Sequence, residues 1–258
     1  MSGRCLAAAL IAMTLGAAGP LAQADDLKVL AAGSVQEVLE DFGRQFAHDS
    51  DQPVAFSFAT TGEVRSRIIA GEAFDLAIAA APTIAELERA GKLVAGLSTE
   101  LGRVGLGVAV REGMPMPDVT TADALKRALT AAKKVAFTDP KVGGTAGIYF
   151  ANLLKSLGVA DVVNKKAVLT AGGRDTAERV AKGEADIGIT FISEITPVTG
   201  AKLVGLLPPD MRNYTTYVAG VVAASPKAET AHAFAAAAVG PSMRERWLRA
   251  GFETPAGR

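Results

Sequence analysis

VAFTDPKVGGTAGIYFANLL, residues 135–154, joins three features that together indicate the fold. The apolar run at 135–138 predicts a strand, and the apolar face repeated over 146–157 predicts a helix. The segment between them ends in a small-residue turn at 143–147, which consists of three glycines, Thr145 and one alanine. Because a helix start leaves backbone N–H groups unpaired and its dipole favours negative charge, this turn is a candidate anion site.

Three further turns have the same composition, at residues 31–34, 59–62 and 171–174. Each follows a predicted strand and opens a predicted helix. In doubly wound sheets such turns gather at the carboxyl ends of the strands, where ligands bind. Small and capping residues are common in any strand-to-helix turn, so the argument depends on the four turns together.

The alternation of strands and helices predicts α/β architecture, with two doubly wound lobes joined by two crossing strands. Lobe I is expected to comprise residues 25–110 and 217–258, and lobe II residues 111–216. The crossing strands are expected at 104–110 and 218–224. The predicted strands are 27–32, 54–59, 75–80, 103–110, 135–138, 166–169, 185–191, 203–207 and 217–224. The predicted helices are one after Ser34, 63–70, one capped by Thr83, 122–132, 146–157, one from the 170–173 turn to Gly183, 227–239 and 241–250.

Residues 1–24 have the pattern of a secretory signal peptide. Arg4 provides the positive start, residues 5–18 are apolar or small, and Ala22-Gln23-Ala24 is a small-x-small cleavage site. A retained membrane anchor is the alternative, but the apolar stretch falls short of the roughly 20 residues that a membrane span needs. We therefore expect an exported, soluble mature chain.

The charge balance excludes the electrostatic footprint of a nucleic-acid-binding protein. The chain has 27 basic and 27 acidic side chains, and loss of Arg4 with the signal leaves a net charge of about −1. Cys5 is the only cysteine, so the mature chain can form no internal disulfide.

Catalytic, metal and cofactor motifs are not evident. Residues 143–145 lack the lysine of a P-loop, and the two histidines, His48 and His232, lie in helices expected at the surface. We expect no enzyme activity, no cofactor and no protein-bound metal. A secreted hydrolase using Ser34 is kept as a remote alternative, which requires a titratable base within hydrogen-bond reach of that residue.

Read in order, "LKVLAAGS", "FSFATTGEVRSRI", "FDLAIAAAPTIAELERAGKLV", "FTDPKVGGTAGIYFANLLKSLG" and "GEADIGITFISEI" resemble the periplasmic molybdate-binding proteins of ABC importers. The resemblance covers nearly the whole mature chain. It implies the type 2 periplasmic-binding fold, whose lobes close on a ligand. It further implies a monomeric periplasmic receptor that binds molybdate or tungstate and delivers it to an inner-membrane ABC permease.

The resemblance also implies a set of ligand-binding residues that are neutral hydrogen-bond donors. These are the Ser34 and Thr61 hydroxyls, the Ala146 backbone N–H and a backbone N–H near Gly173 to Asp175; Gly62 and Thr145 adjoin them. The family's tyrosine donor corresponds to Phe191 here, so one donor is expected to be missing. Thr145 replaces a proline of the family pattern and adds a hydroxyl.

Two arginines leave the ligand open. Arg65 and Arg174 each follow one of the small-residue turns by less than a helical turn. If either points into the cleft, its planar fork suits a carboxylate, and the ligand is then a small organic acid or another anion. If both are solvated charges on helix faces, the neutral-donor site for molybdate remains the first hypothesis.

Overall fold

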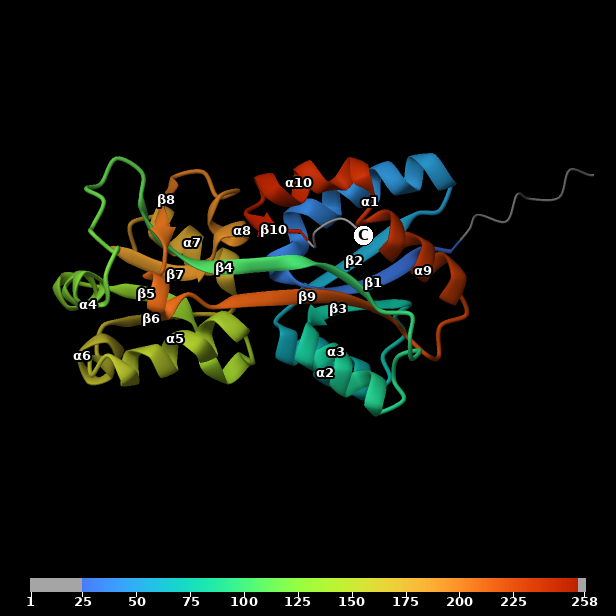
Figure 1. Ribbon diagram of the computed structural model, residues 1–258, viewed down its shortest axis with the longest axis horizontal. Helices are drawn as coiled ribbons and strands as arrows, with labels where there is room; N and C mark the ends of the chain where they lie inside the picture. Colours follow the sequence, from blue (N-terminus) through green and yellow to red (C-terminus); the bar gives the residue numbers. More distant parts are fainter. Residues whose placement is uncertain (1–24, 255–258) are drawn as a thin grey trace, which may run out of the picture.

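The computed structural model describes residues 25–254, so the proposed signal peptide lies outside the described residues. Strands and helices alternate along almost the whole described chain, and all ten strands join one sheet. Figure 1 shows two layered halves connected by long strands that run between them. Within residues 25–254, no helix has the length and apolar character that a membrane span requires.

The ten strands of the described residues are β1 (Leu27–Ala32), β2 (Val54–Ala59), β3 (Leu76–Ala80), β4 (Thr99–Arg111), β5 (Val135–Thr138), β6 (Ala167–Thr170), β7 (Ile187–Phe191), β8 (Ala201–Leu206), β9 (Tyr214–Val221) and β10 (Phe252–Glu253). Nine of the ten correspond to predicted strands; β10 was not predicted, and β4 begins at Thr99, four residues before its predicted start.

Helices fill most of the connections between the strands. The α-helices are α1 (Gln36–Ser50), α2 (Thr61–Ile69), α3 (Ala81–Arg89), α4 (Ala122–Ala131), α5 (Thr145–Ser156), α6 (Ala160–Asn164), α7 (Gly173–Ala181), α8 (Ile192–Ile195), α9 (Ala228–Ala237) and α10 (Arg244–Arg249). Four 3₁₀ turns accompany them: η1 (Gly33–Val35), η2 (Pro140–Val142), η3 (Pro209–Met211) and η4 (Pro241–Met243).

The sheet has the strand order β2-β1-β3-β9-β4-β7-β5-β6, with β8 and β10 also paired to β4. Pairs β1–β2, β1–β3, β5–β6 and β5–β7 are parallel, as βαβ connections require. The first part of β4 pairs antiparallel with β9, and its second part pairs with β7 and β8. Strand β4 therefore links the two halves. The lobe boundaries at 110/111 and 216/217 remain our proposal.

Strand β9 differs from the prediction, which placed it at 217–224. It begins at Tyr214, and Thr215 and Thr216 extend its ladder with β4, since threonine suits a pleated surface despite its polarity. At the other end, Val222 forms only an isolated bridge with Leu93 before the chain turns. The shift places Tyr217 inside the strand.

The start of α3 is a second correction. Ala80 occupies the N-cap position, and Thr83 is the third residue of the helix, not its cap. Pro82 lies in the first turn, where its missing N–H costs no hydrogen bond. Helices α6 and α8 were not predicted, because four or five residues are too few to show a helical repeat.

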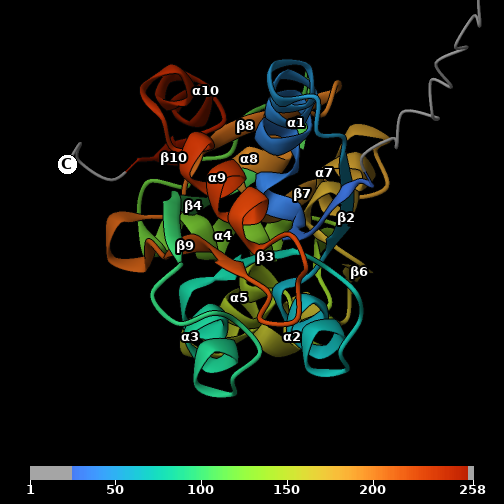
Figure 2. The ribbon, with the colours of Figure 1, turned by 90° about the vertical axis from the view of Figure 1, so that its right-hand side faces the viewer.

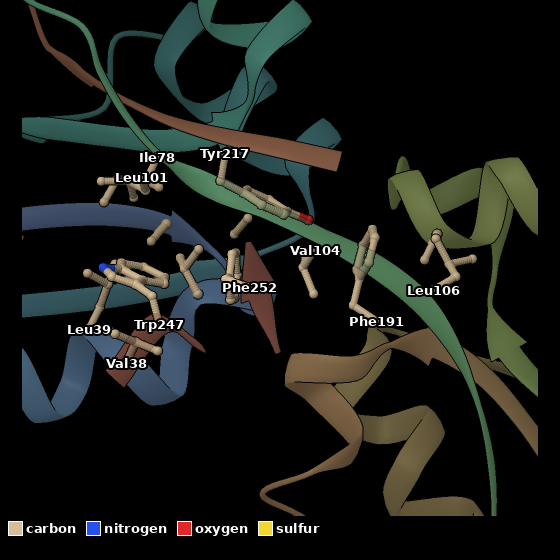
Figure 3. Close-up of a cluster of buried hydrophobic side chains, with 14 of the residues drawn as sticks. Val38, Leu39, Ile78, Leu101, Val104, Leu106, Phe191, Tyr217, Trp247 and Phe252 are labelled. Atoms are coloured by element: carbon tan, nitrogen blue, oxygen red, sulfur yellow. The ribbon is translucent and has the colours of Figure 1, made fainter. Parts of the chain in front are cut away.

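Helices cover both faces of the sheet. Figure 2 shows α1 and α10 on one side of the strands and α2 and α3 on the other. The main core continues through β4, and an edge-to-face aromatic row runs along it (Figure 3). Ring centroids are 6.1 Å apart for Phe191–Tyr217, 6.2 Å for Tyr217–Phe252 and 4.8 Å for Trp247–Phe252. This row extends from Phe191, at the base of the candidate binding cavity, to Trp247 on α10.

Candidate functional site

A cavity of about 320 Å³ lies where the four small-residue turns meet. Its walls come from η1, the starts of α2, α5 and α7, and the strands β7 and β9. The sequence-predicted residues Ser34, Thr61, Thr145, Ala146, Gly173 and Arg174 all line it. The sheet topology thus brings together turns that are up to 140 residues apart in the chain.

Ser34 lies in η1 at the base of the cavity and is 5% exposed. Its Oγ is 2.7 Å from the Tyr217 hydroxyl and 3.5 Å from Oε1 of Glu194. The hydroxyl thus lies between two other oxygen-bearing groups. Oxygen atoms of Ser34, Tyr217 and Glu194 therefore gather at the base of the cavity.

Tyr217 was not predicted as a site residue. Its ring is buried in the aromatic row, and Figure 3 shows its hydroxyl directed toward the Phe191 side. Burial, with a smaller contribution from the charge of Glu194, raises the pKa of Tyr217 above its usual value, so the phenol stays protonated and can donate. Phe191 lines the same wall without a hydroxyl. The cavity thus has no hydroxyl at position 191, and a tyrosine hydroxyl from β9 lies at its base.

At the start of α2, one threonine caps the helix and the next lines the cavity. Thr60 is the N-cap: its Oγ1 accepts from the Glu63 N–H at 3.2 Å and donates to the Val142 carbonyl at 2.5 Å. Thr61 is 6% exposed and lines the cavity. Because Thr60 provides the cap, the Thr61 hydroxyl is not needed for capping.

Gly62 contacts the opposite half of the molecule instead of the cavity. Its N–H donates to the Gly143 carbonyl at 3.1 Å. A Cβ on Gly62 would lie 2.8 Å from the Gly143 Cα, so only glycine permits this approach. The structure does not place this predicted ligand residue in the cavity wall. Gly62 instead joins the α2 wall of the cavity to the α5 wall through its bond to Gly143.

The start of α5 presents the turn with which the sequence analysis began. Its N-cap is Gly144, which provides no side-chain capping bond, and Thr145 and Ala146 begin the helix at the cavity wall. First-turn N–H groups have no intrahelical partner. Gly147 lies against β5, since a Cβ there would be 2.1 Å from the Thr138 carbonyl oxygen. That close approach fixes the helix start relative to the strand.

The start of α7 forms the third helix N-terminus at the cavity. Gly172 caps it without a side-chain bond, and Gly173 and Arg174 follow. The Arg174 side chain is 46% exposed, and its Nε lies 3.4 Å from Glu178 on the same helix. Arg174 is therefore a cation at the rim of the cavity with one weak surface partner.

Arg65 lies elsewhere. Its Nε donates to both carboxylate oxygens of Glu86, at 2.8 and 2.9 Å, and the residue is not part of the cavity wall. Of the two arginines that could have selected a carboxylate, only Arg174 reaches the cavity. His48 and His232 are both exposed helix residues, as predicted.

Glu194 is the second residue that sequence reasoning missed. It lies on the unpredicted helix α8, lines the cavity and is 7% exposed. Its Oε2 accepts from Thr190 Oγ1 at 2.5 Å. Burial raises the pKa of this carboxyl above its usual value, while hydrogen bonds from Thr190, the Phe191 N–H and Ser34 act in the opposite direction. The only signal in the sequence was an acidic residue three positions after Phe191.

The Ser34 hydrolase alternative finds one titratable group near the serine, the Glu194 carboxyl at 3.5 Å, the outer limit of a hydrogen bond. Burial favours the acid form of this carboxyl, and the acid form cannot take up the serine proton. Among residues 25–254, no group of three or more His, Cys, Asp or Glu side chains is arranged to hold a metal ion. The helix N-termini and hydroxyls at this cavity form an arrangement whose electrostatics favour an anion.

The family model for bacterial extracellular solute-binding proteins matches residues 27–253. The chain belongs to that family. It is 28% identical over 202 residues to an aconitate isomerase of a Pseudomonas species, covering 78% of this chain and 76% of that protein. It is also 28% identical over 244 residues to the molybdate-binding protein ModA of Escherichia coli K12, covering 93% and 94%.

The structure resembles the periplasmic molybdate-binding protein of Azotobacter vinelandii, with a TM-score of 0.76 at 20% identity, over 90% of this chain and 100% of that one. The predicted α/β fold of the periplasmic binding proteins is thereby confirmed. The resemblance to molybdate-binding proteins seen in the sequence is confirmed as well.

Proposed function

We propose that this protein is the periplasmic receptor of an ABC importer and captures a small anion in the cavity between its two halves. One observation carries the proposal: three helix N-termini, those of α2, α5 and α7, meet at one cavity together with the hydroxyls of Ser34 and Tyr217. The starts of α5 and α7 supply backbone N–H groups, and α2 supplies the Thr61 hydroxyl, all without a formal charge. The dipoles of the helices add favourable potential for an anion.

Molybdate or tungstate is the first candidate ligand. A site built mainly of neutral donors favours a fully deprotonated oxyanion, and each hydrogen bond to a charged group contributes about 1.5–3 kcal/mol. Several such bonds supply tight binding without a cation at the centre. The molybdate-binding relatives support this choice. Ser34, Thr61, Thr145, Ala146 and Gly173 are the proposed binding residues.

A small organic carboxylate is the second candidate, and Arg174 is the observation that favours it. Its guanidinium lies at the cavity rim, where its only ion-pair partner among the described residues is the weakly held Glu178. The planar fork of arginine binds carboxylates in two-point fashion. The relative that is an aconitate isomerase supports an organic acid as ligand.

A thermal-shift panel on ligand-stripped protein distinguishes the candidates. The panel contains molybdate, tungstate, sulfate, phosphate and a series of di- and tricarboxylates. A ligand that binds only the native state at a hundredfold excess over its dissociation constant stabilises the fold by about 2.7 kcal/mol. Stabilisation by molybdate and tungstate alone would establish the first candidate, and stabilisation by a carboxylate alone the second. If no anion raises the melting temperature, the receptor proposal is wrong.

A further inference from the structure

Glu194 is an acidic side chain placed inside a cavity that otherwise suits an anion. It is buried, it lines the cavity, and its carboxyl contacts Thr190 and Ser34. Among residues 25–254, no ion pair includes it. An ionised, unpaired carboxylate in this position would be costly by itself and would repel a bound anion.

The charged groups on α7 do not neutralise Glu194. Arg174 contacts Glu178, and Asp175 pairs with Arg179 at 3.0 Å. The Asp175 carboxylate also accepts from a backbone N–H in the turn before the helix. The start of α7 approaches Glu194 closely and its dipole favours the ionised form, but no charged side chain of the helix pairs with this carboxyl.

The other elements around Glu194 are neutral or acidic. Tyr217 on β9 is a phenol whose hydroxyl contacts Ser34, and Glu63 on α2 is a second carboxylate in the cavity wall. Strands β4 and β8 meet the opposite, apolar side of α8, where a Cβ on Gly107 would contact leucine and isoleucine side chains. Burial without a cationic partner therefore favours the neutral form of the carboxyl, against the hydrogen bonds and the α7 dipole that favour its charge.

The two oxygens of the Glu194 carboxyl are engaged unequally by their neighbours. Oε2 is occupied by the Thr190 hydroxyl at 2.5 Å. Oε1 lies on the Ser34 side, 3.5 Å from its hydroxyl, so it has room for its own hydrogen. A carboxylic acid protonated at Oε1 is a donor, like the serine and tyrosine hydroxyls beside it.

Building on the receptor function proposed above, we propose that Glu194 occupies the cavity as a carboxylic acid and donates a hydrogen bond to the bound anion, so that each complex holds one proton on this residue. The base of the cavity, formed by Ser34, Tyr217 and Glu194, then presents hydrogen-bond donors to the anion and favours anions that are fully deprotonated. Because the anion stabilises the protonated form of Glu194, binding weakens as the pH rises above the pKa that this carboxyl has in the empty protein.

Glu194→Gln tests the proposal, because the amide keeps the shape and a donor but cannot titrate. Glu194→Ala removes the donor, and Glu229→Gln on α9 is the matched control for loss of one carboxylate far from the cavity. Affinities for molybdate and citrate are measured from pH 7 to 10. Infrared difference spectra of wild type against Glu194→Gln, with and without these anions, detect a protonated carboxyl directly.

We expect a protonated-carboxyl band at pH 7 that is absent in Glu194→Gln and present in Glu229→Gln. We also expect wild-type affinity to fall with rising pH, approaching tenfold per pH unit, while Glu194→Gln stays within about threefold and Glu194→Ala binds more than tenfold more weakly at pH 7. A missing band, or equal pH dependence in wild type and Glu194→Gln, overturns the proposal. A band with no binding of any anion instead overturns the receptor function, and the role of Glu194 as a donor with it.

Discussion

Replacing Ser34 by alanine removes one donor from the base of the cavity and little core volume. The hydroxyl is buried, and its closest partner is the Tyr217 hydroxyl at 2.7 Å. Loss of a hydrogen bond to a charged ligand costs about 1.5–3 kcal/mol, which corresponds to a roughly 10- to 150-fold weaker affinity. The free energy of unfolding should fall by about 1–3 kcal/mol, because the buried Tyr217 hydroxyl loses its partner at 2.7 Å.

The assay is calorimetric titration with the anion that gives the largest thermal shift, combined with urea unfolding of the empty protein. Ser193→Ala is the matched control, since the Ser193 hydroxyl is buried, has no hydrogen-bond partner within residues 25–254 and is not part of the cavity wall. The control should bind like wild type. If Ser34→Ala binds within twofold of wild type, the reasoning about the cavity base is refuted.

Two further substitutions test closure and ligand class. Gly62→Ala should weaken binding by about tenfold, because the added Cβ would lie 2.8 Å from the Gly143 Cα and keep the two halves apart. The free energy of unfolding should be unchanged or higher, because alanine favours helices. X-ray scattering should show a more open molecule. Gly205→Ala, with open space around it, is the control, and equal affinities would show that this contact does not limit closure. Arg174→Ala should lower carboxylate affinity more than tenfold but molybdate affinity less than about threefold, measured by titration. Arg65→Ala should change neither the carboxylate affinity nor the molybdate affinity. If Arg174→Ala instead lowers molybdate affinity more than carboxylate affinity, Arg174 does not select a carboxylate.

The sequence predicted the fold well because its local signals agree with one another. The turn after β5 shows the reason: a buried strand, a glycine-rich turn and an amphipathic helix follow one another, which is the order of a βα unit. The same pattern recurs at η1, α2 and α7, so the position of the cavity followed from topology. Boundaries differed by a few residues where polar β-formers such as Thr215 extend a strand.

The site was predicted less completely, because two of its groups depend on three-dimensional contacts. Tyr217 is an ordinary aromatic residue of a strand until the pairing of β9 with β4 places its hydroxyl beside Ser34. Glu194 lies on a helix of four residues, too short to show a period, and its burial depends on the close approach of Gly173. Neither contact follows from spacing in the chain.

Gly62 and Arg65 illustrate the opposite limit. Both follow the second small-residue turn, which made them candidates for ligand contact. Packing decides otherwise, since the Gly62 N–H is bonded to Gly143 and the Arg65 guanidinium to Glu86. A motif locates the end of a strand, but the direction of each group depends on the elements packed around it.

The most direct test of the account is a crystal structure of the protein with the anion that stabilises it most in the thermal-shift panel. We expect the anion in the cavity within hydrogen-bond distance of the Ser34 and Tyr217 hydroxyls and of the first-turn N–H groups of α5. An anion bound elsewhere on the protein, with this cavity filled only by water, would contradict the central claim that the small-residue turns form the binding site.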